Sequence, residues 1–126
     1  MAKKLLLIED DHAQQISWKQ VFRNWGHYDV VLANDGAEGL MKLPENPDII
    51  ILDMQMPKLN GLGFLKKLFT NDSYVDFRKI PIFALTVWSD DPSILKAVNK
   101  YPNVTLISKE EAREKVIKII REKIGE

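Results

Sequence analysis

Side chains that can bind a metal ion or act on a phosphoryl group follow several short apolar runs of this sequence. They are two adjacent aspartates, a third aspartate, a threonine and a lysine, namely Asp10, Asp11, Asp53, Thr86 and Lys109. Carboxylates that lie a few ångströms apart repel one another unless a cation lies between them. Ligands that are all oxygen atoms suit Mg²⁺ or Mn²⁺ better than Zn²⁺. The three aspartates therefore indicate a site for a hard divalent cation.

The same residues suit a transfer reaction at phosphorus. One carboxylate, a metal ion and a lysine can together neutralise a phosphoryl group while the carboxylate attacks phosphorus. The Thr86 hydroxyl could then donate a hydrogen bond to a phosphoryl oxygen. Taken singly, an aspartate after a strand is often the N-cap of the next helix, and this interpretation stays open for Asp10 and Asp11. All five residues occur at the ends of four predicted strands, which favours a role in metal binding and phosphoryl transfer over separate structural roles.

Five apolar runs predict the strands that position these residues. The runs are continuous rather than alternating, which is typical of strands buried on both faces of a parallel sheet. They cover residues 5–8, 30–33, 49–52, 82–85 and 104–107. The carboxyl ends of parallel strands lie at one edge of a sheet, and ligands bind there, near the point where the strand order reverses. We therefore expect the chemically competent side chains to meet at this edge.

Segments with helical spacing follow the runs. The first ends near Gly26 and is predicted to place these apolar side chains close to one face: Ala13, Ile16, Val21, Phe22 and Trp25. The others are predicted over residues 36–43, 61–69, 92–101 and 110–124, with a polar loop over residues 71–79. Glu110 and Glu111 are expected in the first turn of the last helix, where they complement the helix dipole.

The alternation of strand and helix predicts an α/β fold. Five strand–helix units in succession favour a parallel sheet with right-handed crossovers, in one domain over residues 1–126. The composition agrees, because 45% hydrophobic residues in a chain of 126 are sufficient for one core. The 18 basic and 18 acidic residues cancel, so the global charge suggests neither a nucleic acid nor a membrane as a direct partner.

The N-terminal apolar run does not form a signal peptide. It is followed by three acidic residues, whereas a signal peptide needs roughly 7–15 apolar residues and a small-residue cleavage site. The chain has no cysteine, which excludes disulfides and thiolate metal sites. No stretch approaches the roughly 20 apolar residues of a membrane-spanning helix. We therefore expect a cytoplasmic location.

The sequence resembles the receiver domain of bacterial response regulators over essentially its full length. The matching segments are residues 5–11 (LLLIEDD), 52–61 (LDMQMPKLNG), 80–86 (IPIFALT) and 108–109 (SK). The second segment is the most specific, because Asp53 is followed by Met56-Pro57 and by Gly61. The resemblance implies a flavodoxin-like, doubly wound α/β fold with five helices and a five-stranded parallel sheet in the order 2-1-3-4-5.

The resemblance also implies a role for each candidate residue. Asp53 would be the phosphoacceptor, and Asp10 and Asp11 would bind Mg²⁺, with Mn²⁺ as the alternative ion, together with Asp53 and the backbone carbonyl of Gln55. Thr86 would be the switch hydroxyl and Lys109 the phosphoryl-binding lysine. The domain would receive its phosphoryl group from a sensor histidine kinase or a phosphotransfer protein and would signal to a downstream protein through altered contacts. It would act as a monomer or weak homodimer.

By the same resemblance, the chain is not a conventional enzyme, although it would catalyse its own phosphorylation and dephosphorylation. No output domain follows residue 126, so we expect either a stand-alone receiver or one domain of a longer regulator. Two other functions stay open. One is a binding module whose output does not depend on phosphate. The other is a flavodoxin-like cofactor-binding protein, which is disfavoured because three carboxylates would repel an anionic flavin phosphate.

Three positions depart from the pattern of this family. Bulky Val87 and Trp88 follow the threonine, where a small residue is usual, and we hypothesise that with Gln55 they set the lifetime of the phosphoryl group. Leu106 replaces the usual tyrosine or phenylalanine of the fifth strand. Glu110 replaces the usual proline after the lysine, where a cis bond would cost about 2.5–4 kcal/mol without proline.

Overall fold

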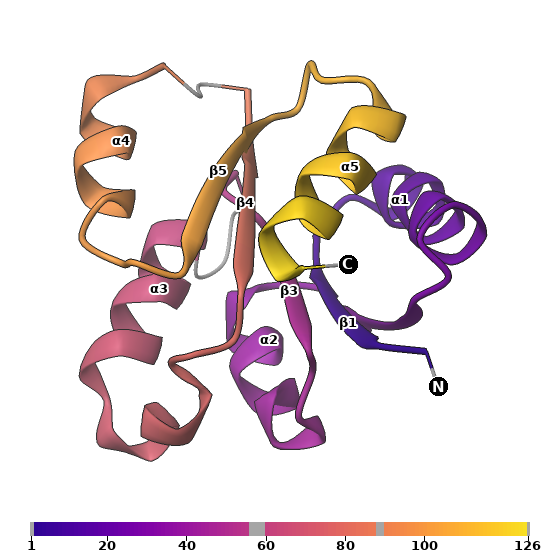
Figure 1. Ribbon diagram of the computed structural model, residues 1–126. Helices are drawn as coiled ribbons and strands as arrows, with labels where there is room; N and C mark the ends of the chain where they lie inside the picture. Colours follow the sequence, from indigo (N-terminus) through magenta and orange to yellow (C-terminus); the bar gives the residue numbers. More distant parts are fainter. Residues whose placement is uncertain (1, 56–59, 88–89, 126) are drawn as a thin grey trace.

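The computed structural model describes residues 2–55, 60–87 and 90–125 of the 126-residue chain. In this part of the chain, five parallel strands form one sheet in the order β2-β1-β3-β4-β5 (Figure 1). The strands are β1 (Lys4–Ile8), β2 (Asp29–Ala33), β3 (Ile49–Asp53), β4 (Ile82–Thr86) and β5 (Val104–Ser108). All five predicted strands and their flavodoxin-like order are confirmed, and each strand is one residue longer than the apolar run that predicted it.

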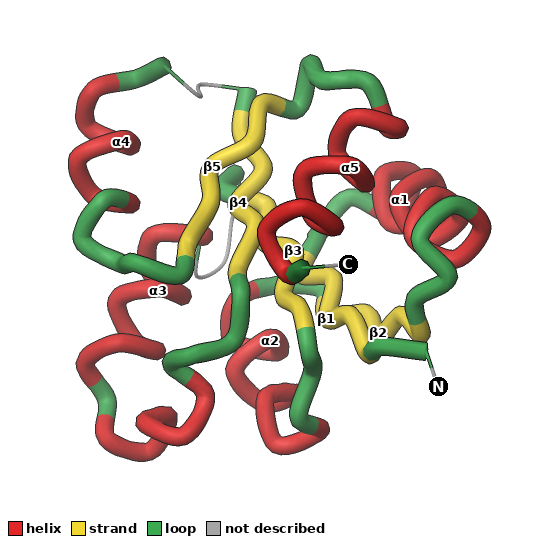
Figure 2. The backbone as a smooth tube through the Cα atoms, in the orientation of Figure 1, coloured by secondary structure: helices red, strands yellow, loops and turns green. Residues whose placement is uncertain are grey.

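Helices cover both faces of the sheet. Their bounds are α1 (His12–Asn24), α2 (Gly36–Lys42), α3 (Gly61–Thr70), α4 (Pro92–Val98) and α5 (Arg113–Ile124), with short 3₁₀ helices η1 (Leu43–Glu45) and η2 (Asp72–Phe77). Figure 2 shows the strands running through the middle of the molecule between helices. The helices α1 and α5 lie together on one face, and α2, α3 and α4 contribute to the core on the other.

The continuous apolar runs are explained by two hydrophobic clusters, one on each face. Successive side chains of a strand point to opposite faces. Leu6 and Ile8 of β1 accordingly belong to the cluster under α2, α3 and α4, whereas Leu5 and Leu7 belong to the cluster under α1 and α5. Full burial of each such side chain contributes about 1.5–3 kcal/mol. A polar residue in β1 would therefore destabilise one of the two cores, whichever face it occupied.

The predicted apolar face of α1 is confirmed at Phe22 but wrong at Ile16 and Trp25. Ile16 is 59% exposed and Trp25 is 44% exposed. Besides Phe22, the side chains that α1 buries are Gln15 and Trp18. The Arg113 guanidinium lies 3.6 Å from the centroid of the Trp18 ring, and Gln15 has hydrogen-bond partners next to β1. Packing by α5 and polar contacts at the end of β1 therefore set the rotation of α1, and neither can be read from apolar spacing.

Further boundaries differ from the prediction, and α4 ends at Val98 rather than at residue 101. The helix α5 begins at Arg113 rather than at residue 110, so Glu110 and Glu111 lie in the preceding turn. There, Glu110 N donates to Ser108 Oγ at 3.1 Å. The predicted loop over residues 71–79 contains η2, whose first turn is capped by Asn71. At Ser108 and at Asn71, backbone N–H groups donate to side-chain oxygens of short polar residues and organise a segment that has no apolar periodicity.

The peptide bond between Lys109 and Glu110 is trans. No cis peptide bond occurs among residues 2–55, 60–87 and 90–125, so Glu110 follows Lys109 through a trans bond. Lys109 N donates to Thr86 O at 2.9 Å, which continues the pairing of β5 with β4 beyond the strand end. None of the helices in the described residues is long and apolar enough to cross a membrane.

Candidate functional site

Four strand ends bring the site together at one edge of the sheet. The strands β1, β3, β4 and β5 are adjacent and parallel, so their carboxyl ends lie side by side. Asp53 is the last residue of β3 and Thr86 the last of β4. Both are buried, as is Glu9 directly after β1. Burial of three polar side chains in one place indicates that they interact with one another or with a ligand.

Asp53 is paired with Lys109, as the predicted chemistry requires. Lys109 Nζ lies 2.7 Å from Asp53 Oδ1, and their side chains are 14% and 4% exposed. The same oxygen accepts a hydrogen bond from Gln55 N at 3.0 Å. A carboxylate with an adjacent cation and a backbone donor is held in one orientation. This arrangement suits a carboxylate that acts as a nucleophile toward phosphorus.

The carboxylate cluster differs from the predicted one by one residue. Carboxylate oxygens of Glu9, Asp10 and Asp53 all lie within 4.8 Å of one another. Asp11 is instead the N-cap of α1, and its Oδ1 accepts a hydrogen bond from Gln14 N at 2.9 Å. The capping interpretation that was left open is therefore correct for Asp11, and Glu9 takes its place in the cluster. The sequence held a signal for this, because Asp11 and Gln14 have the spacing of a capping box.

Glu9 titrates abnormally because of its surroundings. Burial raises its pKa most, followed by a hydrogen bond with Asp53 and by the charge of Asp53, to about 8. The backbone of Asp11 and the charge of Lys109 oppose this rise. In the metal-free domain, Glu9 therefore holds a proton near neutral pH, which reduces the repulsion within the cluster. A divalent cation could replace that proton, and three carboxylates in this position fit the oxygen ligands that Mg²⁺ prefers.

Thr86 is held by a side chain from the neighbouring loop. Gln55 Nε2 donates to Thr86 Oγ1 at 2.7 Å, and Thr86 is fully buried. The other amide atom, Gln55 Oε1, is buried and has no hydrogen-bond partner among the described residues. From the sequence, Gln55 was expected to act only through its backbone carbonyl and its nearness to Asp53. The carbonyl as a metal ligand stays a prediction.

A buried glutamine supports the β1 end of the site and was missed by sequence reasoning. Gln15 Nε2 donates to the backbone carbonyl of Glu9 at 2.5 Å and to Asn34 Oδ1 at 2.8 Å. Asn34 Nδ2 in turn donates to Glu38 Oε2 at 3.1 Å. This chain of hydrogen bonds links the backbone that carries two of the carboxylates to α1 and α2. A glutamine in a helix gives no sequence signal of such a role.

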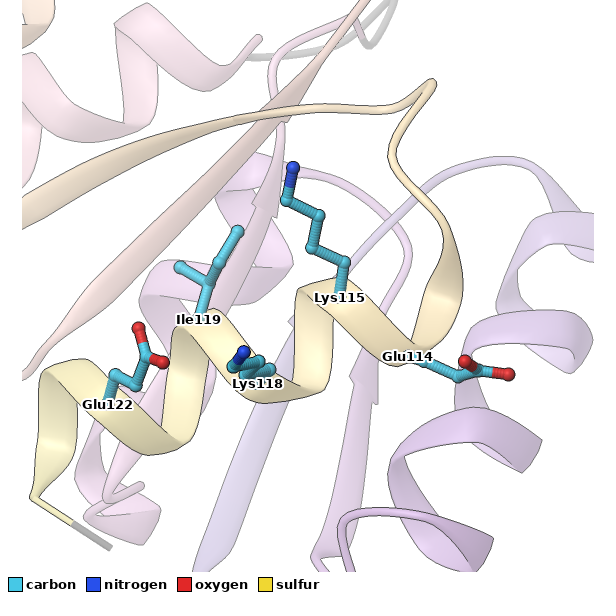
Figure 3. A pocket seen from close by; sticks show the side chains of 5 residues that line it. All are labelled: Glu114, Lys115, Lys118, Ile119 and Glu122. Carbon is cyan, nitrogen blue, oxygen red and sulfur yellow. The ribbon is translucent and has the colours of Figure 1, made fainter.

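Two of the atypical residues, Val87 and Leu106, differ in their burial. Val87 is 47% exposed, and Trp88 lies outside the described residues. Leu106 is partly buried and packs against the cluster on the α4 face. A hollow of about 400 Å³ elsewhere on the surface is lined by α5 alone, with side chains of both charges, as Figure 3 shows: Glu114, Lys115, Lys118, Ile119 and Glu122. It contains none of the candidate residues.

Comparison with known proteins gives one consistent family. The model of the response regulator receiver domain matches residues 5–121. The chain is 33% identical over 125 residues to the osmosensing histidine protein kinase SLN1 of Saccharomyces cerevisiae, a match that covers 94% of this chain and 10% of the kinase. It is 32% identical over 104 residues to the chemotaxis protein CheY1 of Helicobacter pylori (strain 26695), covering 78% of this chain and 82% of that protein.

A solved structure gives the same fold. The receiver domain of the sensor histidine kinase PA1611 from Pseudomonas aeruginosa has a magnesium ion coordinated in its active-site cleft. It is similar to this chain with a TM-score of 0.82, at 24% identity and with full coverage of both chains. The relatives thus differ in size, since this chain spans one tenth of the yeast kinase and most of the chemotaxis protein.

Proposed function

Because this chain belongs to the response regulator receiver domain family and serves phosphorylation-dependent two-component signalling, we propose that Asp53 is the residue that accepts the phosphoryl group. The contact of 2.7 Å between Lys109 Nζ and Asp53 Oδ1 carries this proposal. Lys109 neutralises Asp53 in the resting domain and is placed to neutralise the oxygens of an incoming phosphoryl group. Asp53 is the only member of the carboxylate cluster that contacts a lysine among the described residues.

The transfer would proceed as a displacement at phosphorus. An oxygen of Asp53 forms a bond to phosphorus while the bond from phosphorus to the donor breaks; with a phosphohistidine donor, the imidazole leaves and gains a proton. Bound Mg²⁺, with Mn²⁺ as the alternative, would stabilise the negative charge that develops on the phosphoryl oxygens. Glu9, Asp10 and Asp53 would hold this ion, with the Gln55 carbonyl as a further ligand. Thr86 would then donate a hydrogen bond to a phosphoryl oxygen.

The partners follow from this chemistry. The donor would be a sensor histidine kinase or a phosphotransfer protein, and the phosphorylated domain would bind a downstream protein in the cytoplasm. The domain would act as a monomer or weak homodimer and would contact neither nucleic acid nor membrane directly. It would not be a conventional enzyme, because it acts on its own phosphoryl group, which it accepts and later hydrolyses.

The test is intact-mass spectrometry after incubation with acetyl phosphate and Mg²⁺. We expect one added phosphoryl group that requires Mg²⁺ and is absent from Asp53→Asn. Asp35→Asn is the matched control, since Asp35 caps α2 and asparagine caps helices equally well. If neither acetyl phosphate nor a phosphorylated histidine kinase modifies the native chain, the proposal is wrong and a phosphate-independent binding module is the better interpretation.

A further inference from the structure

Gln55 contacts both Asp53 and Thr86, through two different parts of the residue. Its backbone N–H donates to Asp53 Oδ1 at 3.0 Å, and its side-chain Nε2 donates to Thr86 Oγ1 at 2.7 Å. Both acceptors belong to buried residues at the ends of adjacent strands. The side chain of Gln55 therefore spans from the loop after β3 to the end of β4. It connects the proposed phosphoacceptor to the residue proposed to bind the phosphoryl group.

The Gln55 amide is only half satisfied in this position. Nε2 has a short hydrogen bond to a fully buried hydroxyl, whereas Oε1 is buried and has no partner among the described residues. A buried acceptor without a donor has lost its hydration and gained nothing in return. The resting position of the side chain thus combines one favourable contact with one unfavourable burial. A side chain balanced in this way can be displaced by a modest competing interaction.

We propose that the Gln55 side chain is a latch, whose hydrogen bond to Thr86 holds the hydroxyl in the position of the unphosphorylated domain and opposes its movement toward a phosphoryl group on Asp53. This inference rests on the proposed function, in which Thr86 binds a phosphoryl oxygen. When Thr86 moves, the bond from Nε2 breaks, and the freed amide can bring Oε1 into contact with water. Gln55 is a positioning residue here, because its side chain acts on the phosphoryl group only through Thr86.

The latch has a consequence for ligand affinity. A ligand that hydrogen-bonds Thr86 in its moved position can bind only after the hydrogen bond between Thr86 and Gln55 has broken. The free energy of breaking that bond lowers the apparent affinity for the ligand. Removing the amide should therefore tighten binding, by about fivefold for the net strength of one hydrogen bond.

The experiment uses beryllofluoride, an inert mimic of an aspartyl phosphate, and measures its dissociation constant with saturating Mg²⁺ by tryptophan fluorescence and by amide NMR shifts. Gln55→Met keeps the length of the side chain and removes both amide atoms. Gln20→Met is the matched control on the exposed side of α1. We expect Gln55→Met to bind about fivefold more tightly than the native chain, and Gln20→Met to bind equally.

The decisive variant combines this substitution with Thr86→Val, which removes the hydroxyl and keeps the shape. If Gln55 acts through Thr86, Gln55→Met should have no effect in the Thr86→Val background. Equal or weaker binding by Gln55→Met, or a gain that persists without the hydroxyl, overturns the latch while leaving the proposed function intact. Failure of the native chain to bind beryllofluoride and to accept acetyl phosphate would overturn both.

Discussion

Lys109 Nζ lies 2.7 Å from Asp53 Oδ1, and this ion pair is mostly shielded from water. Lys109 is the cation that compensates a carboxylate cluster in the metal-free domain. Its importance for stability should therefore depend on whether Mg²⁺ is present, since either cation can neutralise Asp53.

Removal of the lysine charge should destabilise the metal-free domain. Lys109→Met leaves Asp53 buried without its cation, and we expect a loss of about 2–4 kcal/mol in the free energy of unfolding. Millimolar Mg²⁺ should restore part of this loss. Urea denaturation with and without Mg²⁺ measures both effects. Lys115→Met is the control, because it breaks an exposed ion pair with Glu111 and should cost less than about 1 kcal/mol. Equal losses for the two variants would contradict the prediction.

Mg²⁺ affinity should distinguish the three acidic residues after β1. Glu9→Gln and Asp10→Asn each remove one negative charge from the cluster, and we expect Mg²⁺ binding to weaken by about tenfold or more. Asp11→Asn should change it by less than about twofold, because asparagine replaces aspartate as an N-cap. Titration of amide NMR shifts with Mg²⁺ gives the three dissociation constants. A large loss for Asp11→Asn alone would restore Asp11 as a ligand.

The stability of the metal-free domain should fall as the pH rises. The pKa of Glu9 is raised from 4.5 to about 8 by burial and by Asp53, so between these values the folded chain binds more protons than the unfolded chain. The contribution of Glu9 is thus fully present below pH 4.5 and is lost as the pH approaches 8, at no more than about 1.4 kcal/mol per pH unit.

Denaturation in chelator at several pH values measures this slope. Glu9→Gln should remove it and should be more stable than the native chain at pH 8, because glutamine resembles the protonated side chain. Saturating Mg²⁺ should also reverse the trend, since the ion binds the ionised form. An unchanged slope in Glu9→Gln would assign the pH dependence to another group.

Gln15 should affect both stability and Mg²⁺ affinity. Gln15→Leu removes the donor to the carbonyl of Glu9 and to Asn34, and it leaves the buried carbonyl of Glu9 unsatisfied at a cost of about 1–3 kcal/mol. Because that carbonyl belongs to the backbone carrying Glu9 and Asp10, Mg²⁺ binding should weaken as well. Gln20→Leu, on the exposed side of α1, provides the comparison for both measurements. A loss of stability with unchanged Mg²⁺ affinity would restrict Gln15 to a structural role.

The sequence by itself determined the fold and the convergence of several candidate residues. Strands buried on both faces require continuous apolar runs, and such runs were visible at all five strands. Because β3, β4 and β5 pair in parallel, their carboxyl ends lie at one edge of the sheet, and this does not depend on how the helices pack. Asp53 and Thr86 are the last residues of β3 and β4, and Lys109 directly follows β5, so their convergence could be predicted without coordinates.

Only the tertiary structure decided which way individual side chains point. In α1, one residue of rotation corresponds to about 100°, so the contacts of Arg113 and Gln15, rather than the spacing of apolar residues, fixed the buried face. After β1, Asp11 is the N-cap of α1, and Glu9 rather than Asp11 belongs to the carboxylate cluster. Such choices depend on contacts between residues distant in sequence or on competition for one hydrogen bond, which residue types and spacing do not resolve.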